Sequence, residues 1–145
     1  MAKQYERIML KLSGEALGKD GRLFDHEKID QVAGILKQAA DSGVQLGIVI
    51  GAGNLWRGRL GGAAGMDAVS ADMMGMLGTV MNCLCMKEAL LRHGVHAHVM
   101  SALEMPRVAE TYNRDLALEY MEKGHVVLFA AGLGNHFFTT DSAVA

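Results

Sequence analysis

Short apolar runs alternate with longer helical patterns along this chain. Four runs of mainly apolar residues (7–12, 44–50, 95–100 and 126–130) are each followed by small residues, as expected of strands that end in turns. The run 44–50 is almost continuously apolar, which predicts a strand covered on both faces of its sheet.

The stretches between these runs have the periodicity of helices. Asp25 can cap a helix whose apolar positions 29, 32, 33, 36 and 40 recur at spacings of three and four. The stretches 70–92 and 114–122 predict two further helices, closed by Gly94 and Gly124. Strands that alternate with helices indicate a parallel sheet. We therefore expect an α/β fold with a single domain over residues 1–145, a three-layer αβα sandwich with a mainly parallel central sheet.

Composition narrows the classes of function. Half of the 145 residues are apolar, and 14 basic against 16 acidic residues give a net charge of −2. We therefore expect a globular protein with neither nucleic-acid nor membrane partners, because no overall charge attracts it to either. The longest charge-free stretches, 42–55 and 73–86, are shorter than a membrane span. The N-terminus has no apolar leader, which predicts a cytoplasmic protein.

The candidate chemistry follows the predicted strands directly. Ligands of parallel sheets bind beyond the carboxyl ends of the strands. Here those ends carry KLSGE from Lys11, GAGNLWRG from Gly51, the pair 101–102, and GLGN from Gly132. Glycines let backbone N–H groups approach a ligand, and Lys11 and Arg57 add positive charge, which suits a polyphosphate.

Each of these features also has a plain structural interpretation. Lys11 alone is typical of a solvated surface, 51–53 of an ordinary turn, and Arg57 of a partner for a nearby acid. Convergence of the features on one edge of one sheet is what predicts a site.

Other familiar motifs are absent or incomplete. No Walker loop is present, because Asp20 follows Gly18 and Lys19. GAGNLW matches the first half of a dinucleotide fingerprint, but Trp56 stands where a small residue must allow close helix–strand packing. A dehydrogenase is therefore not expected. Cys83 and Cys85 fall on opposite sides of the predicted helix, so we expect neither a disulfide framework nor a zinc site from them.

Asp72 and the histidines each have two interpretations. Asp72 can accept the hydroxyls of a ribose at the mouth of the site, or it is simply a first-turn acid of a helix. The methionine-rich helix that contains it is expected to be buried on more than one side, which favours an oligomer. His93, His96 and His98 form a loose cluster, with His96 and His98 on one face of a strand. Two ligands without a nearby third do not predict a metal site.

The last segment, FFTTDSA at 137–143, follows a glycine-rich strand end. Thr139 or Thr140 can cap a helix whose free N–H groups then face the site, and the alternative is a hydrophobic staple with a cap and no ligand.

Four motifs together resemble those of a known family. KLSGE at 11–15, GAGN-x-x-RG at 51–58, ADMMGMLGTVMN at 71–82 and AGLGNHFFTTDSA at 131–143 are similar, in order and spacing, to motifs of the bacterial UMP kinases of the amino acid kinase superfamily. The resemblance covers essentially the whole chain and about the N-terminal three-fifths of the family's chains. It implies an amino acid kinase-like fold, truncated here at the C-terminus.

The resemblance also implies an activity. The family transfers the γ-phosphoryl of ATP, with Mg²⁺, to UMP for pyrimidine nucleotide synthesis, as a homo-oligomer (a hexamer) activated by GTP and inhibited by UTP. The segment 18–23 matches the GTP-responsive region in position. No general base is needed, because the acceptor is an anionic phosphate oxygen. Positioning and charge stabilisation are enough.

Roles for individual residues follow from the same resemblance. Lys11, Leu12, Ser13 and Gly14 would cradle the ATP phosphates together with Gly53 and Arg57. Asp72 would hold the UMP ribose, and Ala52 would offer its backbone N–H to UMP although the family usually has glycine there. Asp141 would orient the cationic groups, so that the catalytic residues would be Lys11, Arg57 and Asp141. The residues that would surround uracil and the UMP phosphate are Leu133, Gly134, Asn135, His136, Phe137, Phe138, Thr139 and Thr140.

Departures from the family affect these expectations. Leu133 and His136 replace a usual threonine and proline, which is expected to weaken UMP affinity. The part of the family beyond Ala145 supplies most of the adenine pocket. We therefore expect an open sheet edge, an uncovered apolar face and little kinase activity from the 145-residue chain alone.

Two other functions stay open. A kinase for an amino acid or a carbamate would share the glycines and the lysine, although FFTTD and Asp72 argue against it. Competition between UMP and glutamate or aspartate separates the two. A non-catalytic nucleotide-binding or oligomerisation module would bind UMP or UTP without transferring phosphate.

Overall fold

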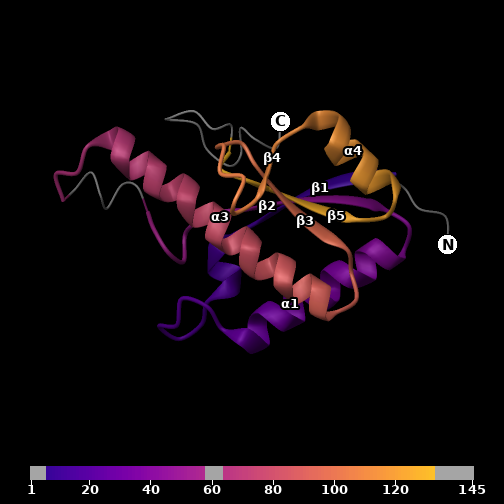
Figure 1. Ribbon diagram of the computed structural model, residues 1–145. Helices are drawn as coiled ribbons and strands as arrows, with labels where there is room; N and C mark the ends of the chain where they lie inside the picture. Colours follow the sequence, from indigo (N-terminus) through magenta and orange to yellow (C-terminus); the bar gives the residue numbers. More distant parts are fainter. Residues whose placement is uncertain (1–5, 58–63, 133–145) are drawn as a thin grey trace.

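A computed structural model describes residues 6–57 and 64–132, and the structural statements below concern these residues. Its five strands form one sheet in which every pairing is parallel (Figure 1). The order across the sheet is β1-β2-β5-β3-β4. The strands are β1 (Arg7–Leu12), β2 (Gln45–Ile50), β3 (Ala97–Ser101), β4 (Glu110–Thr111) and β5 (Val126–Ala130).

Helices cover both faces of the sheet. α1 (His26–Asp41) and α3 (Ala68–Arg92) pack together on one face, and α4 (Arg114–Glu122) lies on the other (Figure 1). A short 3-10 helix, η1 (Gly14–Leu17), follows β1 and contacts α1. This arrangement confirms the predicted αβα class with its parallel sheet.

The helices begin where side chains can cap them. Asp25 accepts a hydrogen bond from the Lys28 N–H at the start of α1, as predicted, and Asp67 and Asn113 cap α3 and α4 in the same way. Gly94 and Gly124 follow α3 and α4 with φ of +79° and +82°, a conformation that favours glycine. Because Asp67 is the cap, α3 begins at Ala68 rather than at the predicted residue 70.

Two short elements have no sequence signal, and β2 and β3 differ from their predicted bounds by one or two residues. η1 and β4 are four and two residues long, too short to show a periodicity. β3 begins at Ala97 rather than 95, so His96 precedes the strand instead of lying in it. β1, α4 and β5 have the predicted bounds.

The core lies mainly between the sheet and the α1–α3 layer. Leu46, Ile48 and Ile50 of β2 face this layer and are almost completely buried, and β2 is covered on both faces as predicted. A smaller cluster that includes Met121 and Val127 lies under α4.

α3 is the central helix of this core. With 25 residues and a mean hydropathy of 1.3 over its best 18-residue window, it is long and apolar enough for a membrane span, a possibility that counting charge-free stretches missed. Its contacts with α1, β3 and β5, however, are those of a helix packed on a sheet. Cys83 is fully buried in this packing, and burial raises the pKa of its thiol to about 12.

Candidate functional site

The ends of four neighbouring strands meet at one edge of the sheet. The register pairs Leu12 with Ile50, so β1 and β2 finish side by side, and the Gly51 N–H donates to the Leu12 carbonyl at 2.9 Å. β5 lies on the other side of β2, and the Ala102 N–H after β3 donates to the Ala130 carbonyl at the end of β5 at 3.1 Å. The predicted convergence is therefore confirmed for the strand ends and for the described residues that follow them. We call the residues that follow each strand its tail.

The tails of β1 and β2 touch through glycine. Gly14 is buried, and a Cβ built on it would lie 2.3 Å from the Gly51 carbonyl oxygen and 2.8 Å from the Gly53 nitrogen. Only a residue without a side chain fits between these backbones. Ser13 caps η1 by accepting a hydrogen bond from the Glu15 N–H at 3.2 Å. KLSG and GAG thus form one continuous backbone surface.

Arg57 forms an ion pair with Glu15 across this surface. Both side chains are largely exposed, at 43% and 58%. Gly53 lies beside the pair, since a Cβ built on it would be 3.8 Å from Glu15 Oε1 and 3.9 Å from Arg57 Nη2. The plain interpretation of Arg57, a partner for a nearby acid, is therefore confirmed, and the same contact holds the guanidinium next to the glycine tail. Sequence reasoning assigned no role to Glu15, and its place directly after KLSG was the only available signal.

Lys11 lies on β1 with its side chain exposed. Side chains alternate along a strand, and Leu10 and Leu12 pack against the core on the α1–α3 side. Lys11 therefore points to the α4 side of the sheet, next to its register partner Val49 of β2. Leu12 is partly buried against the core and its carbonyl accepts from the Gly51 N–H, so its role toward ATP stays a prediction.

The β2 tail is also fixed to α3. The Trp56 indole N–H donates to the Ala71 carbonyl at 2.9 Å, and Ala52 packs against Gly78. Asp72, next to Ala71 in the chain, is half-buried in the part of α3 that contacts this tail. It lies beyond the first helical turn, which contains no acid, so the interpretation of Asp72 as a first-turn acid was wrong. Its proposed role toward a ribose stays a prediction.

The remaining predicted residues, 133–141 with Asp141 among them, lie outside the described residues, so their roles stay predictions. The described part of the β5 tail ends at Ala131 and Gly132, with φ of +66° and +56°. A non-glycine residue in this left-handed region is uncommon, and Ala131 is held there by hydrogen bonding to α3.

Comparison with known proteins agrees with this geometry. The model of the amino acid kinase family matches residues 6–145. The chain belongs to the amino acid kinase family. It is similar to the solved UMP kinase from Ureaplasma parvum, with 32% identity and a TM-score of 0.91, and to that from Bacillus anthracis, with 35% identity and a TM-score of 0.92.

These comparisons cover nearly all of this chain but only part of its relatives. The match to the Ureaplasma parvum enzyme covers 97% of this chain and 62% of that enzyme's chain. The match to the Bacillus anthracis enzyme covers 98% of this chain and 59% of that enzyme's chain. The predicted resemblance to the N-terminal part of bacterial UMP kinases is therefore confirmed, and with it membership of a kinase family.

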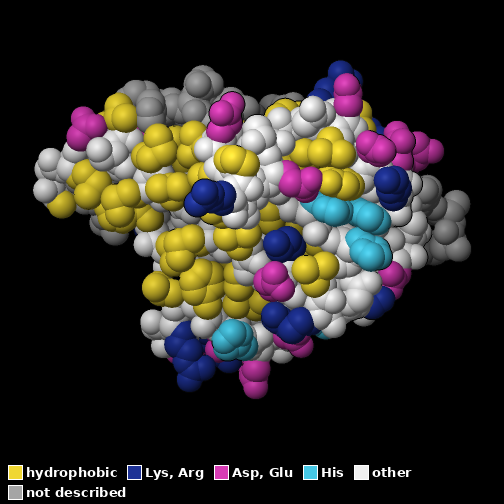
Figure 2. Space-filling view, viewed as in Figure 1, with side chains coloured by type: hydrophobic (Ala, Val, Ile, Leu, Met, Phe, Trp, Pro, Cys, Tyr) yellow, Lys and Arg dark blue, Asp and Glu magenta, His cyan; other side chains and the backbone are white. Residues whose placement is uncertain are grey.

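The chain also carries a cluster of histidines whose members differ from the predicted ones. His93 lies apart, because its Nε2 contacts Asp30 of α1 at 2.8 Å. His96 and His98 stack instead on His125, with ring centroids 4.6 and 5.1 Å apart, and Figure 2 shows histidines gathered beside α4. Among the described residues, no three His, Cys, Asp or Glu side chains are placed to hold a metal ion.

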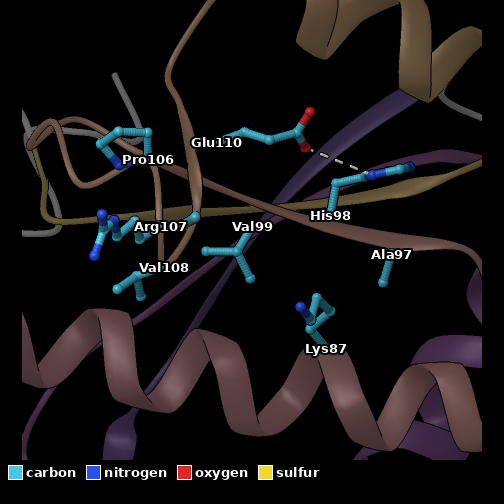
Figure 3. Close-up of a pocket in the computed structure, with 9 residues that line it drawn as sticks. Lys87, Ala97, His98, Val99, Pro106, Arg107, Val108 and Glu110 are labelled. Atoms are coloured by element: carbon cyan, nitrogen blue, oxygen red, sulfur yellow. Dashed lines mark ion pairs between the residues drawn. The ribbon is translucent and has the colours of Figure 1, made fainter.

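Neighbouring groups tie this cluster to a surface pocket. His98 Nδ1 lies 3.6 Å from Glu110 Oε2, and the Tyr120 hydroxyl donates to the same carboxylate at 2.5 Å. His98 and Glu110 help to line a pocket of about 260 Å³, together with Lys87 and Arg107 (Figure 3). Of the residues predicted for the nucleotide site, those that the structure describes do not line this pocket.

The cluster predicts an acid-sensitive stability. Burial is the main cause that lowers the pKa of both His98 and His125, and the neighbouring His96 lowers both further. Lys87 also lowers the pKa of His98, whereas Glu110 raises it. Lys123 also lowers the pKa of His125. One of these rings must accept at the 2.9 Å contact between His98 Nε2 and His125 Nδ1, which two protonated rings cannot do.

Because both pKa values are lowered on folding, the unfolded chain binds these protons more readily. The stabilisation is complete above the unfolded pKa of about 6.5 and is lost as pH falls through the folded values. We expect the free energy of unfolding, measured in urea, to fall from about pH 7 to about pH 5, and His125→Gln to flatten this dependence. The exposed His26→Gln variant is the control that should keep it. Equal slopes for wild type and His125→Gln would contradict the prediction.

Proposed function

We propose that this chain forms the UMP site and the phosphate-binding half of the ATP site of a UMP kinase. The observation that supports this most is the contact of the KLSG and GAG tails through Gly14, with Arg57 beside Gly53. Backbone N–H groups next to a cation at the ends of parallel strands suit phosphates, and the solved relatives of similar fold are UMP kinases.

In the proposed reaction a UMP phosphate oxygen attacks the γ-phosphorus of ATP. The bond from that phosphorus to the β–γ bridging oxygen breaks as the new bond forms, and ADP and UDP leave. Lys11, on the α4 side of the edge, and Arg57, beside Gly53, would neutralise charge on the transferred group, and the glycine tails would align donor and acceptor. Mg²⁺ enters as part of the ATP–Mg²⁺ substrate and shields the phosphates.

The Arg57–Glu15 pair is weak enough to open for a phosphate. An ion pair this exposed contributes at most about 1 kcal/mol. A charge-assisted hydrogen bond from a guanidinium to a phosphate contributes about 1.5–3 kcal/mol. A nucleotide phosphate at the tails would therefore recruit Arg57, while Glu15 keeps the guanidinium close to Gly53 in its absence.

We propose that copies of this chain associate through the surface of α3. Figure 2 shows apolar side chains gathered over this helix. The large apolar residues of α3 that are exposed are Val69, Met74, Leu77, Met81 and Leu91. Exposed apolar side chains gathered on a helix are typical of an interface. We propose a cytoplasmic homo-oligomer, with the hexamer, GTP activation and UTP inhibition of the family as part of the proposal.

Calorimetric titration with UMP tests the proposed function. We expect the chain to bind UMP, and Arg57→Met to weaken binding about tenfold, the effect of one charged hydrogen bond. The melting temperature of Arg57→Met should stay close to that of wild type, since the lost ion pair is exposed. The control Lys37→Met breaks another exposed ion pair, with Asp41, and should leave UMP binding unchanged. Absence of UMP binding, or stronger binding of aspartate or glutamate, would contradict the proposal.

A coupled UDP-forming assay then separates binding from catalysis. We expect little turnover from this 145-residue chain and substantial turnover from a version extended by the family's C-terminal half. Equal turnover of the two would contradict this division of the site. Binding without turnover in both versions would favour a non-catalytic nucleotide-binding module.

A further inference from the structure

Two polar side chains interrupt the buried face of α3. Thr79 is 6% exposed and Asn82 is completely buried. A spacing of three places both on the same side of the helix, toward the sheet. Polar groups in such a position are costly unless they are hydrogen-bonded, so their partners indicate why they are there.

Asn82 is bonded to the tail of β2. Its Nδ2 donates to the Gly51 carbonyl and to Asn54 Oδ1, both at 2.8 Å, and its Oδ1 accepts from Asn54 Nδ2 at 3.2 Å. Asn54 Nδ2 also donates to the Leu23 carbonyl at 3.0 Å, in the segment between η1 and α1. One buried amide of α3 thus fixes both ends of the tail segment 51–54.

Thr79 is bonded to the tail of β5. Its Oγ1 accepts from the Ala131 N–H at 2.8 Å and donates to the Met76 carbonyl of its own helix at 2.6 Å. Ala131 is the residue with a φ of +66°, a conformation that persists only where surrounding contacts impose it. Thr79 supplies such a contact at the point where the β5 tail leaves the sheet.

Apart from the bond of Thr79 to its own helix, the bonds of these two side chains to described residues go to tails, and none goes to the body of a strand. Gly51, Asn54 and Ala131 all lie beyond the last residue of their strand. A polar side chain that only needed hydrogen bonds for its own burial would not require partners in the strand tails. Because α3 is one rigid helix, its two tethers fix the distance between the tails of two adjacent strands.

We propose that Thr79 and Asn82 are positioning residues that hold the β2 and β5 tails in register with each other at the nucleotide site. The inference rests on the proposed function for its ligand. When two tails from separate strands must contact one nucleotide, a variable distance between them weakens binding of that nucleotide. The tails then have to be ordered on binding, and the entropy lost in ordering them opposes binding. Both side chains are buried and bonded to the tails, so in this proposal each acts on the nucleotide only through the tail it holds.

The test compares Thr79→Val and Asn82→Leu, which keep the side-chain size, with Thr79→Ser, which keeps the hydroxyl. Val80→Ala is the matched control, because Val80 lies between them in the same core without bonding to a tail. We expect Thr79→Val and Asn82→Leu each to weaken UMP binding about tenfold. Thr79→Ser keeps the hydroxyl and should bind UMP like wild type. Val80→Ala should bind UMP like wild type, although it is less stable.

Amide hydrogen exchange, followed by NMR in the chain without ligand, gives a second readout. Exchange of the Ala131 amide should speed up in Thr79→Val, and that of the 53–56 amides in Asn82→Leu, beyond any change in Val80→Ala. Emission of Trp56, the only tryptophan of the chain, should shift in Asn82→Leu alone. Tail exchange no faster than in Val80→Ala, or unchanged UMP binding in both variants, would overturn the proposal.

Failure of the proposed function and failure of the positioning role give different results. If wild type binds no UMP, the proposed function fails, and the proposed role at a nucleotide site fails with it. If wild type binds UMP and the tails exchange as in the control, only the positioning role is overturned.

Discussion

Replacing Gly14 by alanine is expected to lower the free energy of unfolding by about 3 kcal/mol, the upper end of overpacking effects. The added methyl group would lie 2.3 Å from the Gly51 carbonyl oxygen and 2.8 Å from the Gly53 nitrogen. Both are backbone atoms, and Gly51 is held by its bond to Leu12 and by Asn82. Neither tail can retreat without breaking these bonds, so UMP binding should be lost together with stability.

Urea unfolding followed by circular dichroism measures this effect. Gly53→Ala is the matched control, because the same substitution in the facing tail would place a methyl group 3.7 Å from the nearest atom, an ordinary contact. We expect its stability to stay within about 0.5 kcal/mol of wild type. If Gly14→Ala unfolds at the same urea concentration as Gly53→Ala, the two tails are not in the close contact described.

The sequence predicted the layers of this fold because its local signals agree with one another. Apolar runs, helical periodicity, the Asp25 cap and the closing glycines all indicate the same succession of strands and helices. The edge that carries the candidate site follows from that succession, since parallel strands must end together. The convergence of the Lys11 and Gly51 segments was therefore predictable without a structure.

Pairs of residues distant in the sequence were not predictable in the same way. The bond between Asn82 and Asn54 joins residues 28 positions apart, and the contact between the stacked rings of His98 and His125 joins residues 27 positions apart. No periodicity carries such information. Proximity in the sequence predicts a cluster of His93 with His96, whereas the end of α3 turns His93 toward Asp30 of α1.

The motif at 71–82 shows how one stretch can serve several purposes. Sequence reasoning assigned it Asp72 and a methionine stripe, and the structure divides the methionines between core and surface. Met76 is buried, whereas Met74 and Met81 are exposed. The same stretch supplies Thr79 and Asn82, whose polarity has no meaning in a helical pattern until their partners in the strand tails are known.

A second large effect is expected where Ala52 meets this helix. Gly78 lies inside α3, where alanine would ordinarily be favoured by about 0.5–1 kcal/mol. A Cβ built on Gly78, however, would lie 2.8 Å from the Cβ of Ala52. Ala52 belongs to the tail that Asn82 and Trp56 fix to the same helix. We expect Gly78→Ala to lower the free energy of unfolding by about 2 kcal/mol in spite of its helix propensity.

The double variant Ala52→Gly, Gly78→Ala should recover this loss, because it moves the single methyl group to the other side of the contact. The coupling energy between the two sites, from a double-mutant cycle in urea, is expected to be about 2 kcal/mol. Gly75→Ala, one turn earlier, is the control. Its methyl group would lie 3.8 Å from the Trp56 ring, so this variant should be as stable as wild type or slightly more stable. If Gly78→Ala proves as stable as Gly75→Ala, the tail does not lie against α3 at this point. The resemblance expects glycine at position 52, and the methyl group that this chain carries there is accommodated because α3 has no side chain at Gly78.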